Sequence, residues 1–237
     1  MANIQTCFSP AIFPLYNAEQ SIVVVIDILR ATSAICTAFE YGVNKIIPVA
    51  SLEEAIEYRK KGFLAGAERD GKVSDGFEFG NSPYSYMNDQ IKDQTIVLST
   101  TNGTKAIHAA KSAHQIIIGS FINLDAIVSF LGSNNKDVVL LCAGWKDRFN
   151  MEDSLFAGAV VKELMEKHHF TTDCDSSIAM SHLFEKAKAD LFSFLENSSH
   201  RLRLRKLELE KDIKYCLTPN QSKIIPILEG DSLVKLV

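Results

Sequence analysis

Acidic and basic side chains that could bind and cleave a phosphate ester follow several short apolar segments of the sequence. Asp27 stands late in a β-branched run, where a buried carboxylate is costly unless it is paired, hydrogen-bonded or bound to a metal ion. Arg30 follows it, and Glu68 and Arg69 follow another apolar run. We interpret Asp27 as a magnesium ligand or an aspartyl nucleophile. An ion pair with Arg30 or Arg69 is the structural alternative.

The best candidate for anion binding is a turn rich in threonine that follows the apolar run 96–99. Small residues and a glycine let backbone N–H groups approach an anion, and the helix predicted next would direct its positive end towards it. An ordinary tight turn, with a threonine capping the helix, is the alternative that needs no ligand. The five residues of this turn are Thr100, Thr101, Asn102, Gly103 and Thr104.

A cysteine and an arginine show the spacing of cysteine-dependent phosphatases, in which a thiolate attacks phosphorus and the arginine binds the phosphoryl oxygens. Here Cys142 is followed by five residues and then Arg148. The intervening loop has one glycine, Gly144, and its bulky Trp145 and acidic Asp147 suit a phosphate cradle poorly. A buried structural cysteine is therefore favoured, and the thiolate route is kept as the alternative.

Two further acids open the predicted helix 151–168. Glu152 and Asp153 lie in its first turn, where acidic side chains are stabilised by the helix dipole without any further role. Magnesium takes a few carboxylates together with water and substrate phosphate. The sequence therefore offers Asp153 as a third magnesium ligand beside Asp27 and Glu68.

The elements that must position these residues alternate between short apolar runs and amphipathic stretches. This alternation predicts a three-layer α/β/α fold with a largely parallel or mixed central sheet, in which the candidate residues gather beyond the carboxyl ends of the strands. We expect one domain, 1–237, with antiparallel C-terminal strands at an edge of the sheet. Strands are expected at 22–28, 45–49, 63–66, 96–99, 115–119 and 137–142, and near Lys214 and Ile224. Helices are expected at 31–41, 51–61, 104–111, 123–131, 151–168 and 177–195.

The basic run 200–206 alternates in polarity as a strand or an exposed ribbon does. A solvated surface is the ordinary interpretation, although its cations could also help to hold an acidic substrate. The sequence therefore gives His200 no catalytic role.

The composition excludes several classes of protein. The formal net charge of −4 argues against general nucleic-acid binding, and the apolar runs are far shorter than a membrane span. No secretory signal precedes the first strand. Five scattered cysteines, an odd number without Cys-x-x-Cys spacing, indicate reduced thiols in a cytoplasmic protein. The expected partner is a small acidic phosphorylated metabolite.

Together these segments resemble the 2-phosphosulfolactate phosphatase family. The matching pieces are Val-Ile-Asp-Ile-Leu-Arg-Ala-Thr (25–32), Gly-Ala-Glu-Arg (66–69), Gly-Phe-Glu-Phe-Gly-Asn-Ser-Pro (76–83), Ser-Thr-Thr-Asn-Gly-Thr (99–104), Cys-Ala-Gly (142–144) with Glu-Asp (152–153), and the tail from 198 to 226. Family members often carry Asp where this chain has Glu78, and often have a Gly-rich stretch where Trp145, Lys146 and Asp147 stand.

The resemblance implies a phosphatase dependent on Mg²⁺ that converts 2-phospho-3-sulfolactate into 3-sulfolactate and phosphate, a step of coenzyme M biosynthesis. It also implies an α/β/α fold and an oligomer, for which a homodimer is the simplest form. Asn81 and Ser82 of the Gly-Asn-Ser-Pro piece join the phosphate-binding candidates. A water molecule or Asp27 itself could attack phosphorus. A non-catalytic protein that senses a phosphorylated metabolite, or a structural protein without a ligand, is the alternative of another class.

Overall fold

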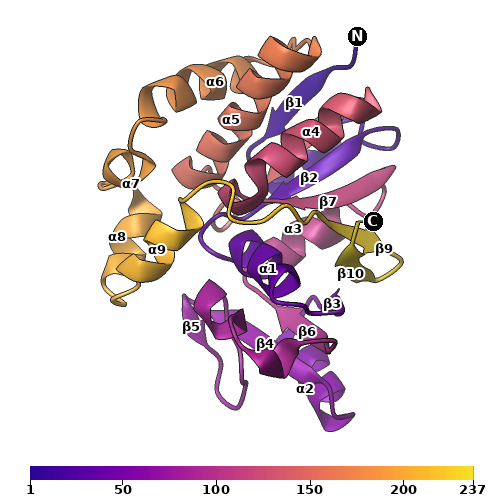
Figure 1. Cartoon of the computed structure of the whole chain (residues 1–237), viewed down its shortest axis with the longest axis vertical. Helices are drawn as coiled ribbons and strands as arrows, with labels where there is room; N and C mark the ends of the chain where they lie inside the picture. The colour runs from indigo at the N-terminus through magenta and orange to yellow at the C-terminus, as the bar shows by residue number, and fades with distance from the viewer. Residues whose placement is uncertain (237) are drawn as a thin grey trace.

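The computed structural model describes residues 1–236 and contains a ten-stranded mixed sheet (Figure 1). The strands are β1 (Ile4–Cys7), β2 (Ile22–Ile26), β3 (Lys45–Pro48), β4 (Leu64–Arg69), β5 (Lys72–Val73), β6 (Thr95–Ser99), β7 (Gln115–Gly119), β8 (Val138–Cys142), β9 (Pro226–Glu229) and β10 (Ser232–Lys235). Their order in the sheet is β1-β8-β2-β7-β9-β10-β3-β6-β4-β5. Strands β1, β8, β2 and β7 form one parallel group, and β3, β6 and β4 form another.

Helices cover both faces of the sheet. They are α1 (Ala31–Glu40), α2 (Leu52–Lys60), α3 (Gly103–Ala109), α4 (Leu124–Asn134), α5 (Met151–His168), α6 (Asp175–Ala187), α7 (Leu191–Phe194), α8 (Ser199–Arg205) and α9 (Glu210–Cys216). Short 3₁₀ helices lie at Pro10–Leu15, Pro83–Tyr86, Asp89–Ile91 and Phe121–Asn123.

Strand β2 shows why the fold has three layers. Its side chains alternate between the two faces of the sheet, and all of them are buried. Val24 and Ile26 belong to a core shared with α4 and α5, whereas Val23 and Val25 belong to a core shared with α1 and α3. A continuous apolar run is therefore needed at this strand. The predicted α/β/α architecture is confirmed.

The C-terminal part differs from the predictions made for it. The residues near Lys214 lie in α9 rather than in a strand, and the run 200–206 lies mainly in α8. Ser198 caps α8 through a hydrogen bond that its side chain accepts from Arg201 N. The predicted helix 177–195 is divided into α6 and α7. Local alternation of polarity was therefore misleading where a capped helix packs against the rest of the molecule.

The prediction placed the C-terminal antiparallel strands at an edge of the sheet. In the structure β9 and β10 instead lie between the two parallel groups and join them. Each makes only one paired contact with its outer neighbour, Ile227 with Ile117 of β7 and Leu233 with Ile46 of β3. In Figure 1 α4, α5 and α6 accompany β1 and β2, while α2 lies at the opposite end beside β4 and β6. Strand β1, which the sequence reasoning missed, pairs with β8.

Residues that follow β2 and β6 meet at the site, although these two strands lie far apart in the sheet order. Four strands separate β2 from β6, which in a flat sheet would place them more than about 20 Å apart. Yet a Cβ atom added to Gly103, just beyond β6, would lie 3.1 Å from Asp27 Oδ2, just beyond β2. The carboxyl ends of the two groups therefore meet, as the sequence-based hypothesis of a shared site requires.

Within residues 1–236, no helix combines the length and the apolar character that a membrane crossing requires.

Candidate active site

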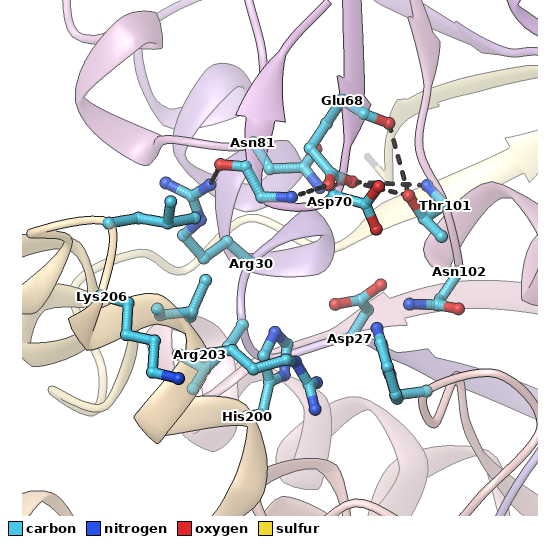
Figure 2. A pocket seen from close by; sticks show the side chains of 15 residues that line it. Asp27, Arg30, Glu68, Asp70, Asn81, Thr101, Asn102, His200, Arg203 and Lys206 are labelled. Atoms are coloured by element: carbon cyan, nitrogen blue, oxygen red, sulfur yellow. Dashed lines mark hydrogen bonds between the residues drawn. The ribbon is translucent and has the colours of Figure 1, made fainter.

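A cavity of about 280 Å³ lies where the carboxyl ends of β2, β4 and β6 meet the loop after β8, with α8 along one side. Figure 2 shows acidic side chains on one side of the cavity and basic side chains from α8 and the residue after it on the other. The residues that line the cavity are Asp27, Leu29, Arg30, Glu68, Asp70, Gly71, Asn81, Thr101, Asn102, Trp145, His200, Arg203, Leu204, Lys206 and Leu207.

Asp27 is held at the base of the cavity by the first turn after β2. Its backbone N–H donates to Thr32 Oγ1 at 3.0 Å, and its Oδ1 accepts a bond from Ala31 N at 3.4 Å. The residue is only 7% exposed. Burial raises the pKa of Asp27 to about 6; His200 lowers this pKa and Glu68 raises it. The carboxylate is therefore poorly neutralised by the protein and ready to bind a cation or a proton.

Glu68 connects three separate segments around the cavity. Its Oε1 accepts a bond from Gly71 N at 2.5 Å, and its Oε2 accepts bonds from Asn81 Nδ2 and Thr101 Oγ1, both at 3.2 Å (Figure 2). The sequence had suggested that Glu68 follows its strand. In the structure Glu68 is instead the next-to-last residue of β4. These hydrogen bonds fix the positions of Asn81 and Thr101 at the cavity.

Arg30 lines the cavity, but its charge is already compensated. Its Nη1 lies 2.5 Å from Asp212 Oδ2 in a buried ion pair, and its Nη2 donates to Gly71 O at 2.8 Å. Both partners lie in segments that the sequence reasoning did not connect with Arg30. The guanidinium therefore ties α9 and the β4–β5 turn to the start of α1.

The threonine-rich turn contributes less directly than expected. Thr100 and Thr104 are buried and bond to each other: Thr104 N donates to Thr100 Oγ1, and Thr104 Oγ1 donates to Thr100 O, both at 3.0 Å. Only Thr101 and Asn102 of the turn line the cavity. A Cβ at Gly103 would meet Ala31 Cβ at 2.7 Å, so glycine is required there for close packing beside Asp27.

Asp153 is fully buried and lies outside the cavity lining. Its Oδ1 accepts from Ile28 N at 2.8 Å, and its Oδ2 accepts from Asn150 Nδ2 at 2.8 Å and from Gly144 N at 3.2 Å. Burial and the neighbouring Asp27 raise the pKa of Asp153 well above its usual range. Its bonds join the chain after β2 to the chain after β8, which gives this carboxyl group a structural task.

The structure does not bring the proposed cysteine site together. Cys142 is completely buried, and burial raises the pKa of its thiol well above the ordinary value. The loop after Gly144 is a tight hairpin in which Trp145 N and Arg148 O are 3.0 Å apart. Arg148 is exposed and does not line the cavity. A thiolate in contact with an arginine-bound phosphate has no support in this arrangement.

Two other predicted residues also lie outside the cavity lining. Arg69 donates from Nη1 to Glu68 O at 2.6 Å and from Nη2 to Ser99 Oγ at 3.0 Å, so it links β4 with β6. Ser82 lines a neighbouring hollow that shares Asn81 with the main cavity.

The oxygen atoms at the acidic side of the cavity suit magnesium. Within residues 1–236, no three His, Cys, Asp or Glu side chains converge as a metal-binding group. Magnesium, however, is usually bound through one or two carboxylates, with water and substrate phosphate as its other ligands. Asp27 and Glu68 provide such carboxylates, and the buried Asn81 Oδ1 has no hydrogen-bond partner in the described part of the chain. This donor set fits the ion, and Asp153, the third acid that the sequence offered, lies outside the cavity lining.

Comparison with known proteins identifies the family of the chain. Residues 7–231 match the model of the family described as 2-phosphosulpholactate phosphatase. The chain belongs to this family. It is 42% identical over 215 residues to a probable 2-phosphosulfolactate phosphatase of Thermotoga petrophila, covering 91% of this chain and 92% of the relative. Similar proteins with the same name occur in Caldanaerobacter subterraneus, 39% identical over 218 residues and 90% of both chains, and in Clostridium botulinum, 33% identical over 222 residues, 92% of this chain and 93% of the relative.

In this family member, the sequence reasoning missed a histidine–carboxylate pair. His200 Nδ1 lies 2.5 Å from Glu152 Oε1, and His200 lines the cavity. Glu152 is 1% exposed, and its Oε2 has no hydrogen-bond partner in the described chain. A buried acid in the first helical turn had been explained by the helix dipole alone. The signal that could have found the pair is the match of the tail around 198–200 to the family.

Proposed function

We propose that this chain is a magnesium-dependent phosphatase that hydrolyses 2-phospho-3-sulfolactate to 3-sulfolactate and phosphate. Membership of the family supports the reaction. The observation that carries the proposal is the position of the buried Asp27 carboxylate, which faces the oxygens of Glu68 and Asn81 at one side of a cavity whose other side is cationic. Such a cavity can bind a phosphate ester that carries a second acid group, with the phosphate at the acidic side and the acid group at the cationic side.

Each residue has a task that follows from its position. Asp27 and Glu68, with Asn81 Oδ1, would hold Mg²⁺, which when bound neutralises charge on the phosphoryl oxygens. Asp27 either attacks phosphorus or orients the attacking water. Thr101 and Asn102 border the phosphoryl group on the side of β6. Arg203 and Lys206 line the other side of the cavity.

His200 is the residue suited to protonate the leaving alcohol. The leaving group of this ester is a secondary alkoxide, which needs a proton as the P–O bond breaks. Glu152 binds Nδ1 of His200 at 2.5 Å and so orients the ring, which leaves Nε2 as the nitrogen available to the cavity. The pair works as a general acid with its orienting carboxylate.

The first test is release of phosphate from 2-phospho-3-sulfolactate with Mg²⁺ and with excess EDTA. We expect turnover with the metal and its loss in the chelator. His200→Asn should lower kcat by about 10²- to 10⁴-fold, whereas His182→Asn, an exposed control on α6, should not change it.

Cys142→Ala distinguishes the thiolate mechanism, because the buried thiol should be dispensable for turnover. Its rate is expected to stay within about threefold of the wild-type rate. Complete loss of activity in a folded Cys142→Ala protein would restore the cysteine mechanism. Full activity in EDTA would remove the metal from the proposal, and absence of phosphate release in every condition would reject the function.

A further inference from the structure

Trp145, the only tryptophan in the sequence, is presented to the cavity by a rigid hairpin turn. Lys146 and Asp147 both have positive φ, 51° and 58°, and the backbones of Trp145 and Arg148 bond to each other at 3.0 and 3.1 Å. Lys105 Nζ bonds to Asp147 Oδ1 at 2.7 Å and so ties the turn to α3. The indole therefore has a defined place at the cavity wall.

Arg203 of α8 stacks on this indole. Its Cζ lies 3.7 Å from the centre of the Trp145 ring, which is the arrangement of a cation–π pair. Stacking occupies the face of a guanidinium group and leaves the N–H bonds at its edge free to bind an oxyanion. Arg203 Nη2 is buried and has no acceptor in residues 1–236. An unpaired buried donor is costly. Arg203 Nη2 therefore points to a ligand that supplies the missing acceptor.

The cations that lack an ion-pair partner indicate where in the cavity such a ligand would bind. Arg30 is compensated by Asp212, and His200 by Glu152. Arg203 and Lys206 also line the cavity, but neither forms an ion pair within the described chain. They stand three residues apart at the end of α8, a spacing that places them on one side of a helix.

These two cations face the acidic side of the cavity. Figure 2 shows Asp27, Glu68 and Asp70 at one side and Arg203 and Lys206 at the other. Phosphate held through a metal ion at the acidic side would direct the remainder of the substrate towards α8. The uncompensated positive charge there suits a second negative group on the same molecule.

We infer that Trp145 and Arg203, assisted by Lys206, form an acid subsite that binds a carboxylate or sulfonate of the substrate and selects phosphate esters that carry one. The inference deepens the proposed function and rests on it for the position of the phosphate. Trp145 orients the guanidinium, and Arg203 binds the acid group through its free edge. The subsite thereby distinguishes anionic phosphate esters from neutral ones, which leave Arg203 Nη2 without a partner.

The kinetic test compares three esters of secondary alcohols: 2-phospho-3-sulfolactate, 2-phospholactate and isopropyl phosphate. Arg203→Met should raise KM for 2-phospho-3-sulfolactate at least about tenfold with little change in kcat. The value of kcat/KM for isopropyl phosphate, which has no second acid group, should remain unchanged. A loss confined to the sulfonated ester assigns the sulfonate to the subsite, and an equal loss with 2-phospholactate assigns the carboxylate.

Arg205→Met is the matched control, because Arg205 is exposed on the same helix and does not line the cavity. It should leave all three esters unaffected. Arg203→Lys keeps the charge but lacks the planar group that stacks on Trp145, so it should restore only part of the affinity.

A binding measurement separates this inference from the proposed function. Trp145 is the sole source of tryptophan fluorescence, so titration of the full chain with 3-sulfolactate should change its emission in a saturable way. Arg203→Met should weaken this response at least about tenfold, and Arg205→Met should not. The titration requires no turnover and therefore reports on the subsite even if no ester is hydrolysed.

Three results would count against the acid subsite while leaving the phosphatase proposal intact. One is an equal effect of Arg203→Met on isopropyl phosphate and on 2-phospho-3-sulfolactate. Another is saturable binding of 3-sulfolactate that Arg203→Met does not weaken. A wild-type emission that does not respond to 3-sulfolactate would also count against it.

Discussion

The carboxyl group of Asp27 is kept in an environment that opposes its charge. It is almost completely buried, and His200, the group that lowers the pKa of Asp27, bonds to Glu152. Ionisation of Asp27 in the folded chain is therefore costly unless a metal ion is present. This property belongs to a functional carboxylate rather than to a member of a structural ion pair, which is the alternative that the sequence left open.

Asp27→Asn should stabilise the metal-free protein while abolishing phosphate release. The pKa of Asp27 is raised from 3.8 to about 6 in the folded state, so the folded protein binds more protons than the unfolded chain between these values. Stability therefore falls as pH rises through this window and stays reduced above it. Removal of the charge should recover about 3 kcal/mol at pH 7.5 and about half as much at pH 5.

Thermal unfolding in EDTA at both pH values measures this effect. The exposed Asp75→Asn variant serves as the control for loss of one negative charge and should change neither melting temperature appreciably. A lower stability of Asp27→Asn at pH 7.5 would show that the carboxylate contributes favourably to the fold, contrary to its buried and poorly compensated position.

At the scale of residues, the sequence identified those that stand at strand ends and missed those that meet through tertiary packing. Asp27 and Glu68 follow or close apolar strands, so the parallel-sheet rule predicts where they point. The pair of Glu152 and His200 joins residues 48 positions apart on two helices, and no local pattern indicates it. The pairing of Asp212 with Arg30 could not be predicted from the sequence for the same reason.

Helices α3 and α8 reach the site in different ways, and only one was foreseen. Helix α3 follows a turn rich in Gly and Thr directly after a strand, which makes its position predictable. Helix α8 follows a Ser cap, but its alternating Arg and Leu residues resemble a strand. Its packing, which buries Leu204, decides between the two structures. The basic side of the cavity therefore could not be predicted from the sequence of α8 alone.

Gly103→Ala tests whether α3 must approach Asp27 closely. In an ordinary helix start, alanine would be favoured over glycine by about 1 kcal/mol. Here the added Cβ would lie 2.7 Å from Ala31 Cβ and 3.1 Å from Asp27 Oδ2. We expect a net loss of about 1–3 kcal/mol of stability together with a lower kcat.

Chemical denaturation and steady-state rates provide the two measurements. Lys111→Ala, which removes only an exposed ion pair just beyond α3, should leave both nearly unchanged. If Gly103→Ala instead raised stability and kept full activity, the turn would be an ordinary helix start, and its close packing beside Asp27 would not be needed for activity.

The two parallel groups of the sheet are joined by a C-terminal hairpin, and few sequence rules could have predicted this. Strands β9 and β10 are the last in the chain, yet they lie between β7 and β3. Strand order within a sheet is set by contacts between distant residues, so a short C-terminal hairpin can fit an edge or a gap equally well from local pattern alone. Their insertion places four strands between β2 and β6, yet Asp27 and Thr101, which follow these strands, line one cavity.

Leu233→Ala should therefore weaken the molecule as a unit rather than loosen its end. Leu233 is fully buried, pairs with Ile46 of β3 and belongs to the core beneath α1. Its truncation is expected to cost about 2–5 kcal/mol, whereas the exposed Lys235→Ala should cost little. Because we expect residues 1–237 to act as one domain, unfolding followed by Trp145 fluorescence and by far-ultraviolet circular dichroism should shift together. Separation of the two transitions would mean that the parallel groups unfold independently, and that the hairpin joins them without making them cooperative.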